Sequence, residues 1–304
     1  MARRTLAALA VALLGATVLI SGCGTRGATD PPPVAEGGES ADRLRRQARE
    51  ALDRYDRAVA AAGGRQGIVV VGERTGQVGT WEEDRPTYKA SLLAGKLAAT
   101  AALPGAPRAE GEVTWDGGGR RTVAIIAADA ALAELVGDGA GDCPECETIE
   151  VTGARLGTAR INTTRGAATA PAWEFTLRGS AVLVTRVAFA ASSGVTVEPP
   201  PWDADNPPRG LRIDAARVTG TTLTAQFVGS PRPATGPCGV DYTAEVVESA
   251  NAVVVIVVSH PFPGERACTA IGGQRTATVQ LAAPLGERAV LEVQQGTPVP
   301  VTVE

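Results

Sequence analysis

The C-terminal third of the chain is a succession of short runs rich in valine, isoleucine and threonine, separated by glycine, asparagine and proline clusters. β-Branched residues favour extended strands, and the intervening residues favour turns. Short strands at this spacing are typical of an all-β sandwich-like or barrel-like module. We expect them at residues 223–228, 240–247, 252–258, 276–281, 289–293 and 299–303. The pattern therefore predicts an all-β domain over residues 211–304.

A proline-rich stretch, PPPWDADNPPRG at residues 199–210, precedes this module and offers little to bury. Proline removes a backbone donor and favours an extended chain, so we expect a semi-rigid linker or long loop there. Residues 40–198 are expected to form a separate domain that contains both helix and strand. The predicted class is thus α+β and predominantly β, with an N-terminal helix plus a hairpin-rich domain followed by the all-β module.

Local patterns place the elements of the first domain. Residues 40–62 predict a helix with Ser40 as its N-cap and an apolar stripe that packs on the sheet that follows. Hairpin turns are expected at residues 116–119, Asp-Gly-Gly-Gly, and at residues 178–180, Arg-Gly-Ser. Residues 88–103 are compatible with either strand or helix. Further elements are expected at residues 128–136, as a short helix, and at 68–71, 150–152 and 159–163, as strands.

The beginning of the chain predicts export and a lipid anchor. Two arginines precede an apolar run at residues 6–20, which suits a secretory signal and is short for a membrane-spanning helix of about 20 residues. The following tetrapeptide ISGC resembles the bacterial lipobox, whose cysteine thiol receives a diacylglycerol and becomes the mature N-terminus. We therefore expect a lipoprotein signal peptide at residues 1–22, lipidation of Cys23, and a flexible tether at 23–39. The alternative is an ordinary signal with an incidental cysteine.

The net charge and the length of the apolar runs limit the classes of partner that the chain can bind. The formal net charge is −4 and there is no basic run, which argues against binding of nucleic acid and of anionic lipid. The longest later apolar run, residues 252–258, is too short to span a bilayer. We expect the protein at the cell membrane, lipid-anchored on its extracytoplasmic face. The expected partners are the membrane itself and an envelope protein or cell-wall ligand.

Four cysteines remain beyond Cys23, and an even number in an exported chain favours disulfides. Cys238 and Cys268 bracket two expected strands, which places them at the same end of a three-strand meander. We predict that these two are bonded to each other. Cys143 and Cys146 are only three residues apart, and we interpret them as a small structural disulfide that closes a turn.

The motif Cys143-Pro144-Glu145-Cys146 has a chemical alternative. Cys-x-x-Cys with proline in second position resembles the active pair of thiol oxidoreductases, which place the first cysteine at a helix N-terminus, where the thiol pKa falls. Here a glycine-rich loop precedes the pair and β-like residues follow it. Glu145 and Glu147 disfavour a thiolate, and the nearest basic residue in that stretch is Arg155. We interpret the pair as structural, with an envelope thiol–disulfide oxidoreductase as the alternative function.

Other chemistries find little support in the residues. A catalytic triad would need the single histidine, His260, and no G-x-S-x-G elbow is present. A zinc site would require His260 and one more cysteine to converge with Cys143 and Cys146 from the other domain. Asp203 and Asp205 leave a weak calcium site open without matching a calcium loop, and no glycine-rich phosphate loop follows a strand. We expect no catalytic residue, no metal and no cofactor.

Residues spread over the exported part also carry a resemblance. They are the CPEC motif, the strand PAWEF at 171–175, and Cys238, Glu248, Cys268, Pro284-Leu285-Gly286, Arg288, Gly296 and Pro298-Val299-Pro300. In these the chain resembles uncharacterised lipoproteins of high-G+C bacteria. The resemblance implies an exported, lipid-anchored architecture and no particular chemistry. We therefore expect a cell-envelope protein that acts as a non-catalytic binding or interaction module.

Overall fold

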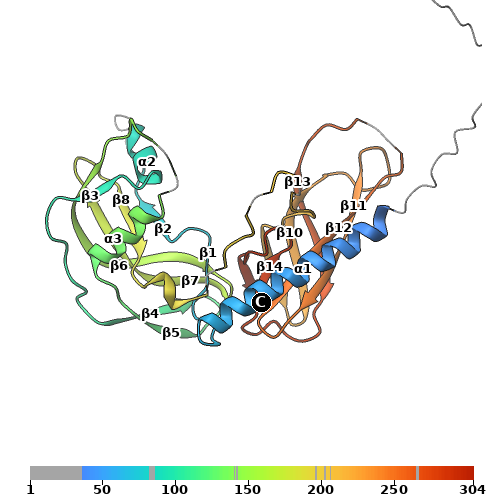
Figure 1. The fold of residues 1–304 in the computed structure, drawn as a ribbon, viewed down its shortest axis with the longest axis horizontal. Helices are drawn as coiled ribbons and strands as arrows, with labels where there is room; N and C mark the ends of the chain where they lie inside the picture. The colour runs from blue at the N-terminus through green and yellow to red at the C-terminus, as the bar shows by residue number, and fades with distance from the viewer. Residues whose placement is uncertain are drawn as a thin grey trace, which may run out of the picture. The chain divides into compact units, whose positions relative to one another are not determined.

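The computed structural model describes residues 36–81, 86–139, 141, 143–195, 197–201, 203–205, 207–264 and 267–304 (Figure 1). The expected signal peptide at 1–22, the lipidation residue Cys23 and the tether up to residue 35 lie outside the described residues. No helix within the described ranges is long and apolar enough to cross a membrane.

Strands outnumber helices, which confirms the predominantly β, α+β class. The first half contains α1 (Glu36–Ala61), β1 (Val70–Val71), β2 (Thr75–Val78), α2 (Pro86–Leu93), β3 (Leu97–Ala99), β4 (Glu110–Trp115), β5 (Arg120–Ala124), α3 (Ala128–Gly137), β6 (Ile149–Thr163), β7 (Gly166–Leu177), β8 (Leu183–Val187) and the 3-10 turn η1 (Ala191–Ser193). The second half contains β9 (Ala215–Thr219), β10 (Thr222–Gly229), β11 (Val240–Glu248), β12 (Ala252–Pro261), β13 (Gly273–Gln280), β14 (Ala289–Glu292) and β15 (Val301–Val303).

Strands β1 to β8 form one sheet built around the long antiparallel pair β6 and β7. One edge of β7 is shared between β4 near its start and β8 further along. The expected hairpins β4–β5 and β7–β8 are both present. The ambiguous residues 88–103 divide between α2 and β3, and the strands expected at 150–152 and 159–163 are a single strand, β6.

The second half is a sandwich of two sheets, ordered β13-β10-β9-β15 and β11-β12-β14. Alternate residues of each strand meet in the core between the sheets, because side chains on a strand point to opposite faces in turn. Phe227 of β10, Val255 of β12 and Val290 of β14 are all fully buried in this core. The sandwich-like module is thus confirmed, with β9 as a strand that the sequence pattern missed.

The expected three-strand meander is wrong. Strand β12 pairs with β11 and, in parallel, with β14, whereas β13 pairs with β10 in the other sheet. The chain therefore crosses between the sheets after β12 instead of turning back beside it. The predicted partners Cys238 and Cys268 nevertheless lie at disulfide distance, with their sulfur atoms 2.11 Å apart. This disulfide ties the entry to β11 to the segment that crosses between the sheets.

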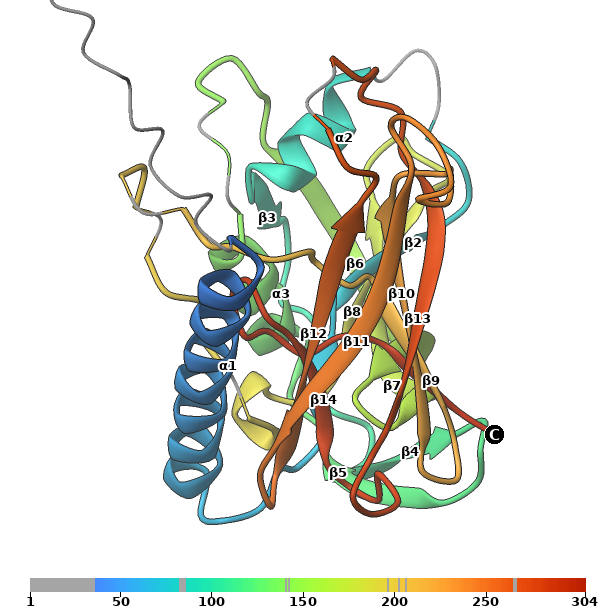
Figure 2. The ribbon, with the colours of Figure 1, turned by 90° about the vertical axis from the view of Figure 1, so that its right-hand side faces the viewer.

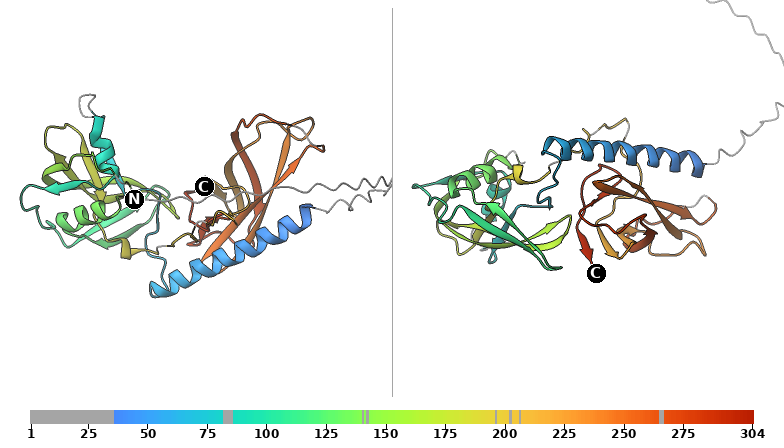
Figure 3. Two further views of the ribbon diagram at one scale, coloured as in Figure 1. Left: turned by 45° about the horizontal axis from the view of Figure 1, so that its top comes forward. Right: turned by 90° about the horizontal axis from the view of Figure 1, so that it is seen from below.

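Helix α1 covers the outer face of the β11-β12-β14 sheet (Figures 2 and 3). Its stripe includes Leu52, Tyr55 and Val59, which pack against Val254 and Ile256 of β12. Strand β12 is consequently buried on both faces, with Val253, Val255 and Val257 toward the sandwich core and Ala252, Val254 and Ile256 toward the helix. Each such side chain contributes about 1.5–3 kcal/mol through removal from water.

Two expectations for this helix are wrong. It begins at Glu36, one turn before the predicted N-cap Ser40, so Ser40 lies inside the helix. It also packs on strands that follow about two hundred positions later rather than on the next sheet. Polar contacts hold it there, because Asn251 donates to Asp56 (Nδ2–Oδ1 2.9 Å) and Arg45 pairs with Glu245 (Nη2–Oε2 2.8 Å).

Candidate functional site

A cleft with a volume of about 640 Å³ lies among β2, α2 and the C-terminal end of α3. Cavities of roughly 300–1,000 Å³ with mixed apolar and polar walls are typical of small-molecule sites. The apolar side chains that line it are Trp81, Leu92, Leu93 and Leu135, and the charged ones are Glu73, Arg74, Lys89, Asp138 and Arg186. The sequence patterns did not indicate any of these residues as a ligand contact.

Arg186 of β8 is the most buried charge in this lining, with 2% of its side chain exposed. It lies opposite Thr75 of β2 in the sheet register, and its Nη1 donates to Thr75 Oγ1 (3.0 Å). Two carboxylates at the end of α3 neutralise it, Asp138 at 2.6 Å from Nη1 and Glu134 at 3.3 Å from Nη2. The negative end of the helix dipole also favours a cation there. Its Nε has no hydrogen-bond partner.

Arg74 immediately precedes β2 and carries a second partly buried guanidinium. Its Nη2 donates to the carbonyl oxygen of Phe189, and the guanidinium lies 5.1 Å from the centre of the Phe189 ring. Among the described residues it forms no ion pair, and its Nε also lacks a partner. Burial and the charge of Arg186 lower the pKa of Arg74. An arginine guanidinium keeps its proton in proteins, so Arg74 is a cation.

The apolar wall comes mainly from α2 and the residues before it. Leu93 at the end of α2 is 60% exposed although it is a large apolar side chain. Trp81 packs edge-on against Tyr88, with ring centres 6.5 Å apart, and donates its indole N–H to Gln77 Oε1 (2.6 Å). The cleft thus places an apolar and aromatic wall beside two guanidinium groups.

The CPEC loop lies on the same connection as Asp138, between α3 and β6. Its cysteines are at disulfide distance, with sulfur atoms 1.94 Å apart. Strand β6 begins at Ile149, so the pair lies in a loop that enters a strand, as the sequence predicted. Among the described residues, Cys143, Glu145 and Cys146 form one group with the spacing of metal ligands. Because the two sulfurs are bonded to each other, they offer no thiolate to a metal.

The sequence around the CPEC motif has no basic residue closer than Arg155, but in the structure Lys96 lies next to this loop. Its ammonium group donates to the carbonyl oxygens of Cys143 and Cys146, the latter at 3.3 Å. Strand β3 runs parallel to β6, with Leu97 opposite Ile149, and this pairing brings Lys96 to the loop. The fold therefore places a cation against the backbone of both cysteines, which the local sequence did not predict.

A close backbone approach fixes this loop beside the cleft. Gly139, which lines the cleft, packs against Gly95, and a Cβ at position 139 would lie 2.6 Å from the Gly95 Cα. Gly95 also has φ +67°, which favours glycine. The two connections, α2–β3 and α3–β6, can approach each other only with glycine at both positions.

Two other candidate residues have structural partners. His260 lies in β12 rather than in a loop, and its Nε2 lies 2.8 Å from Thr243 Oγ1. Asp203 Oδ1 accepts from the backbone N–H of Asp205 (2.9 Å), as in a local turn. Among the described residues, His260 has no contact with a serine that could act as a nucleophile, and Asp203 does not belong to a group of metal ligands.

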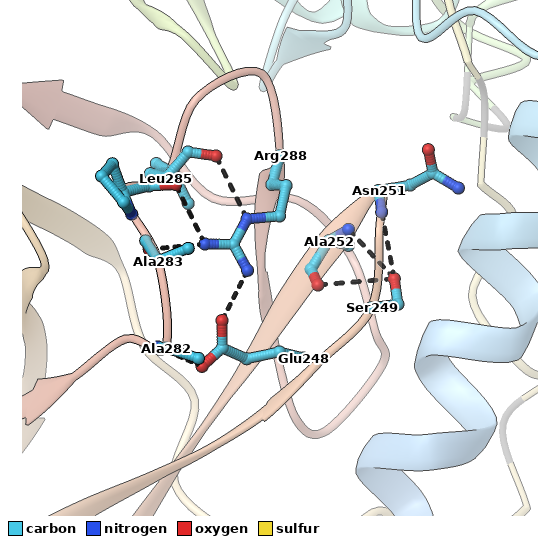
Figure 4. Close-up of polar contacts among 9 residues, drawn as sticks. Glu248, Ser249, Asn251, Ala252, Ala282, Ala283, Leu285 and Arg288 are labelled. Carbon is cyan, nitrogen blue, oxygen red and sulfur yellow. Dashed lines mark hydrogen bonds and ion pairs between the residues drawn. The ribbon is translucent and has the colours of Figure 1, made fainter.

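Figure 4 shows a polar network in the sandwich that joins two residues of the lipoprotein resemblance. Arg288 Nη1 pairs with Glu248 Oε2 (2.5 Å), and its other nitrogens donate to the carbonyl oxygens of Ala283, Pro284 and Leu285. Glu248 Oε1 accepts from the Ala282 N–H (2.9 Å). These contacts fold the loop before β14 so that Leu285 enters the core. Glu248 and Arg288 therefore have a structural role.

The chain was compared with protein-family models, with curated proteins and with solved structures, and none of them matches. The resemblance to lipoproteins of high-G+C bacteria therefore stays a prediction, as does the lipid anchor at Cys23. Functional inference rests on the cleft and its neighbouring loop.

Proposed function

We propose that this protein is a lipid-anchored component of the cell envelope that binds a small ligand in the cleft among β2, α2 and α3. The anchor follows from the lipobox ending in Cys23. The observation that supports binding is the cleft of about 640 Å³, in which the exposed Leu93 and the half-buried Trp81 and Leu92 lie near two guanidinium groups, the buried Arg186 and the half-buried Arg74. We infer a non-catalytic role, because the lining groups are guanidiniums, an ammonium, carboxylates, apolar side chains, the Thr75 hydroxyl and the Gln77 amide. They include no paired nucleophile and base among the described residues.

Filling the cleft is expected to abolish ligand retention. Leu93→Trp adds bulk at an exposed position that lines the cleft, so the fold should tolerate it. The matched control is Val228→Trp, an apolar residue of β10 with 52% exposure outside the cleft. Native mass spectrometry of the protein extracted gently from membranes should show a bound small molecule on the wild type and on Val228→Trp. The proposal would be contradicted if the wild type carries no bound molecule, or if Leu93→Trp carries the same bound molecule as the wild type.

The second candidate function, an envelope thiol–disulfide oxidoreductase, is favoured by the position of Lys96. A positive charge beside a cysteine pair stabilises the thiolate that exchange requires. Against it stand the burial of Cys146 and the strand, rather than a helix N-terminus, that follows the pair. We therefore assign the pair a structural role in holding the loop that carries Asp138.

Replacing Cys143 and Cys146 with serine is expected to lower the free energy of unfolding by about 2 kcal/mol or less, because the closed loop is short. Membrane anchoring should not change. The reduction potential of the wild-type pair should lie well below the range of about −270 to −120 mV that exchange enzymes cover, with an ordinary thiol pKa. A potential inside that range together with a pKa well below 8 would favour the oxidoreductase instead.

A further inference from the structure

We propose that the ligand of the cleft is a small organic monoanion, with a carboxylate or a similar oxyanion that pairs with Arg74 and an apolar part that lies against Trp81, Leu92 and Leu93. This inference rests on the proposed function and names the class of ligand for the same cleft.

The cations that line the cleft are Arg74, Lys89 and Arg186, and they differ in burial and in their partners. Asp138 and Glu134 already pair with Arg186, at 2.6 and 3.3 Å. Glu73 is exposed and forms no ion pair among the described residues, and Lys89 is exposed as well. Arg74 is the guanidinium of this lining that is partly buried and forms no ion pair among the described residues; Arg186 repels it, and Glu134 and Asp138 attract it.

A bound anion would relieve an unfavourable arrangement. Two guanidinium groups line one cavity, and Glu134 and Asp138 offset part of their mutual repulsion. A partly buried charge without an ion-pair partner is still costly. Arg74 also has a buried Nε with no acceptor. A carboxylate matches the fork of a guanidinium and can accept two parallel hydrogen bonds from it. Asp138 and Glu134 carry two negative charges against the single charge of Arg186, and their charge also acts on Arg74 without forming an ion pair with it. A single ligand carboxylate is therefore sufficient to give Arg74 a direct partner.

The apolar wall defines the other half of the ligand. Leu93 is an exposed large apolar side chain, and the Trp81 ring lies on the same cavity. Such a surface gains stability when an apolar ring or chain covers it. An inorganic anion would pair with Arg74 but leave this wall in water, so the geometry favours an anion with an apolar body.

The test compares two probes that differ in charge but hardly in shape, naphthalene-1-acetate and naphthalene-1-acetamide. Binding to the full-length protein in lipid nanodiscs is measured by calorimetry, and empty nanodiscs provide the reference. We expect the carboxylate to bind about tenfold to a hundredfold more tightly than the amide, which corresponds to a hydrogen-bonded charge. Arg74→Gln should remove this preference, and Arg74→Lys should retain part of it.

Arg120→Gln is the control, because Arg120 is an exposed arginine of β5 outside the cleft. It should bind both probes like the wild type. Equal affinity of the wild type for the two probes, or a preference that survives Arg74→Gln, would overturn the inference. If the carboxylate does not bind but the mass retained by the wild type is lost in Leu93→Trp, the anion inference fails while the cleft remains the ligand site. Circular dichroism confirms that each variant is folded.

Discussion

Replacing Arg288 with leucine is expected to lower the free energy of unfolding by about 3 kcal/mol, because it breaks a largely buried ion pair and leaves its partner uncompensated. The side chains of Arg288 and Glu248 are only 14% and 20% exposed. The substitution also takes the hydrogen-bond donor from three carbonyl oxygens in the loop before β14. Urea unfolding followed by circular dichroism measures the change.

The matched control for this variant is Arg217→Leu. Arg217 pairs with Glu304, but its side chain is 48% exposed, and exposed pairs contribute about 0–1 kcal/mol. The loss of unfolding free energy in Glu248→Gln should lie between those of Arg288→Leu and Arg217→Leu, since an amide oxygen can still accept from the Ala282 N–H. If Arg288→Leu and Arg217→Leu unfold at the same urea concentration, the network in Figure 4 does not stabilise the sandwich as described.

The sequence predicts well those elements whose cause is local. The β4–β5 hairpin follows from a glycine-rich turn between two short β-branched segments, which meet because they are neighbours in the chain. The bond between Cys238 and Cys268 was also predicted, although the meander behind that prediction was wrong. The two cysteines meet because the chain crosses between sheets, and no local pattern specifies such a crossing.

Long-range packing could not be predicted from the same patterns. Helix α1 has a clear apolar stripe, but the stripe alone does not specify the sheet against which the helix packs. The unbroken apolar run of β12 contained a signal, because a strand that is apolar at successive positions needs cover on both faces. The sandwich supplies one face, and the other requires an additional element such as α1.

The cleft was missed for a related reason. Arg74, Lys96 and Arg186 are far apart in the chain, and strand pairing brings Arg186 to Thr75 and Lys96 to the cysteine loop. Arg186 did carry a signal, since it is a charged residue within an otherwise apolar strand. A charge at such a position requires partners, and only the fold reveals Glu134 and Asp138 as those partners.

Replacing Cys23 with serine is expected to remove the protein from the membrane fraction or to leave it as an uncut precursor. Serine lacks the thiol that the lipobox chemistry modifies. Each buried methylene of an acyl chain contributes about 0.8 kcal/mol, and two chains hold a protein stably where a single chain does so only marginally. Loss of the diacylglycerol should therefore shift nearly all of the processed protein to the soluble fraction, as seen by fractionation and immunoblotting.

The control for this variant is the Cys143→Ser, Cys146→Ser protein, which should stay with the membrane because those cysteines serve only the loop. The prediction fails if the Cys23→Ser protein is processed normally and sediments with membranes like the wild type.

Mass spectrometry of the mature N-terminal peptide tests the proposed lipid-anchored protein most directly. We expect the mature chain to begin at Cys23 and the thiol of this residue to carry a diacylglyceryl group. A mature chain that begins at another residue, or at Cys23 without lipid, would contradict it.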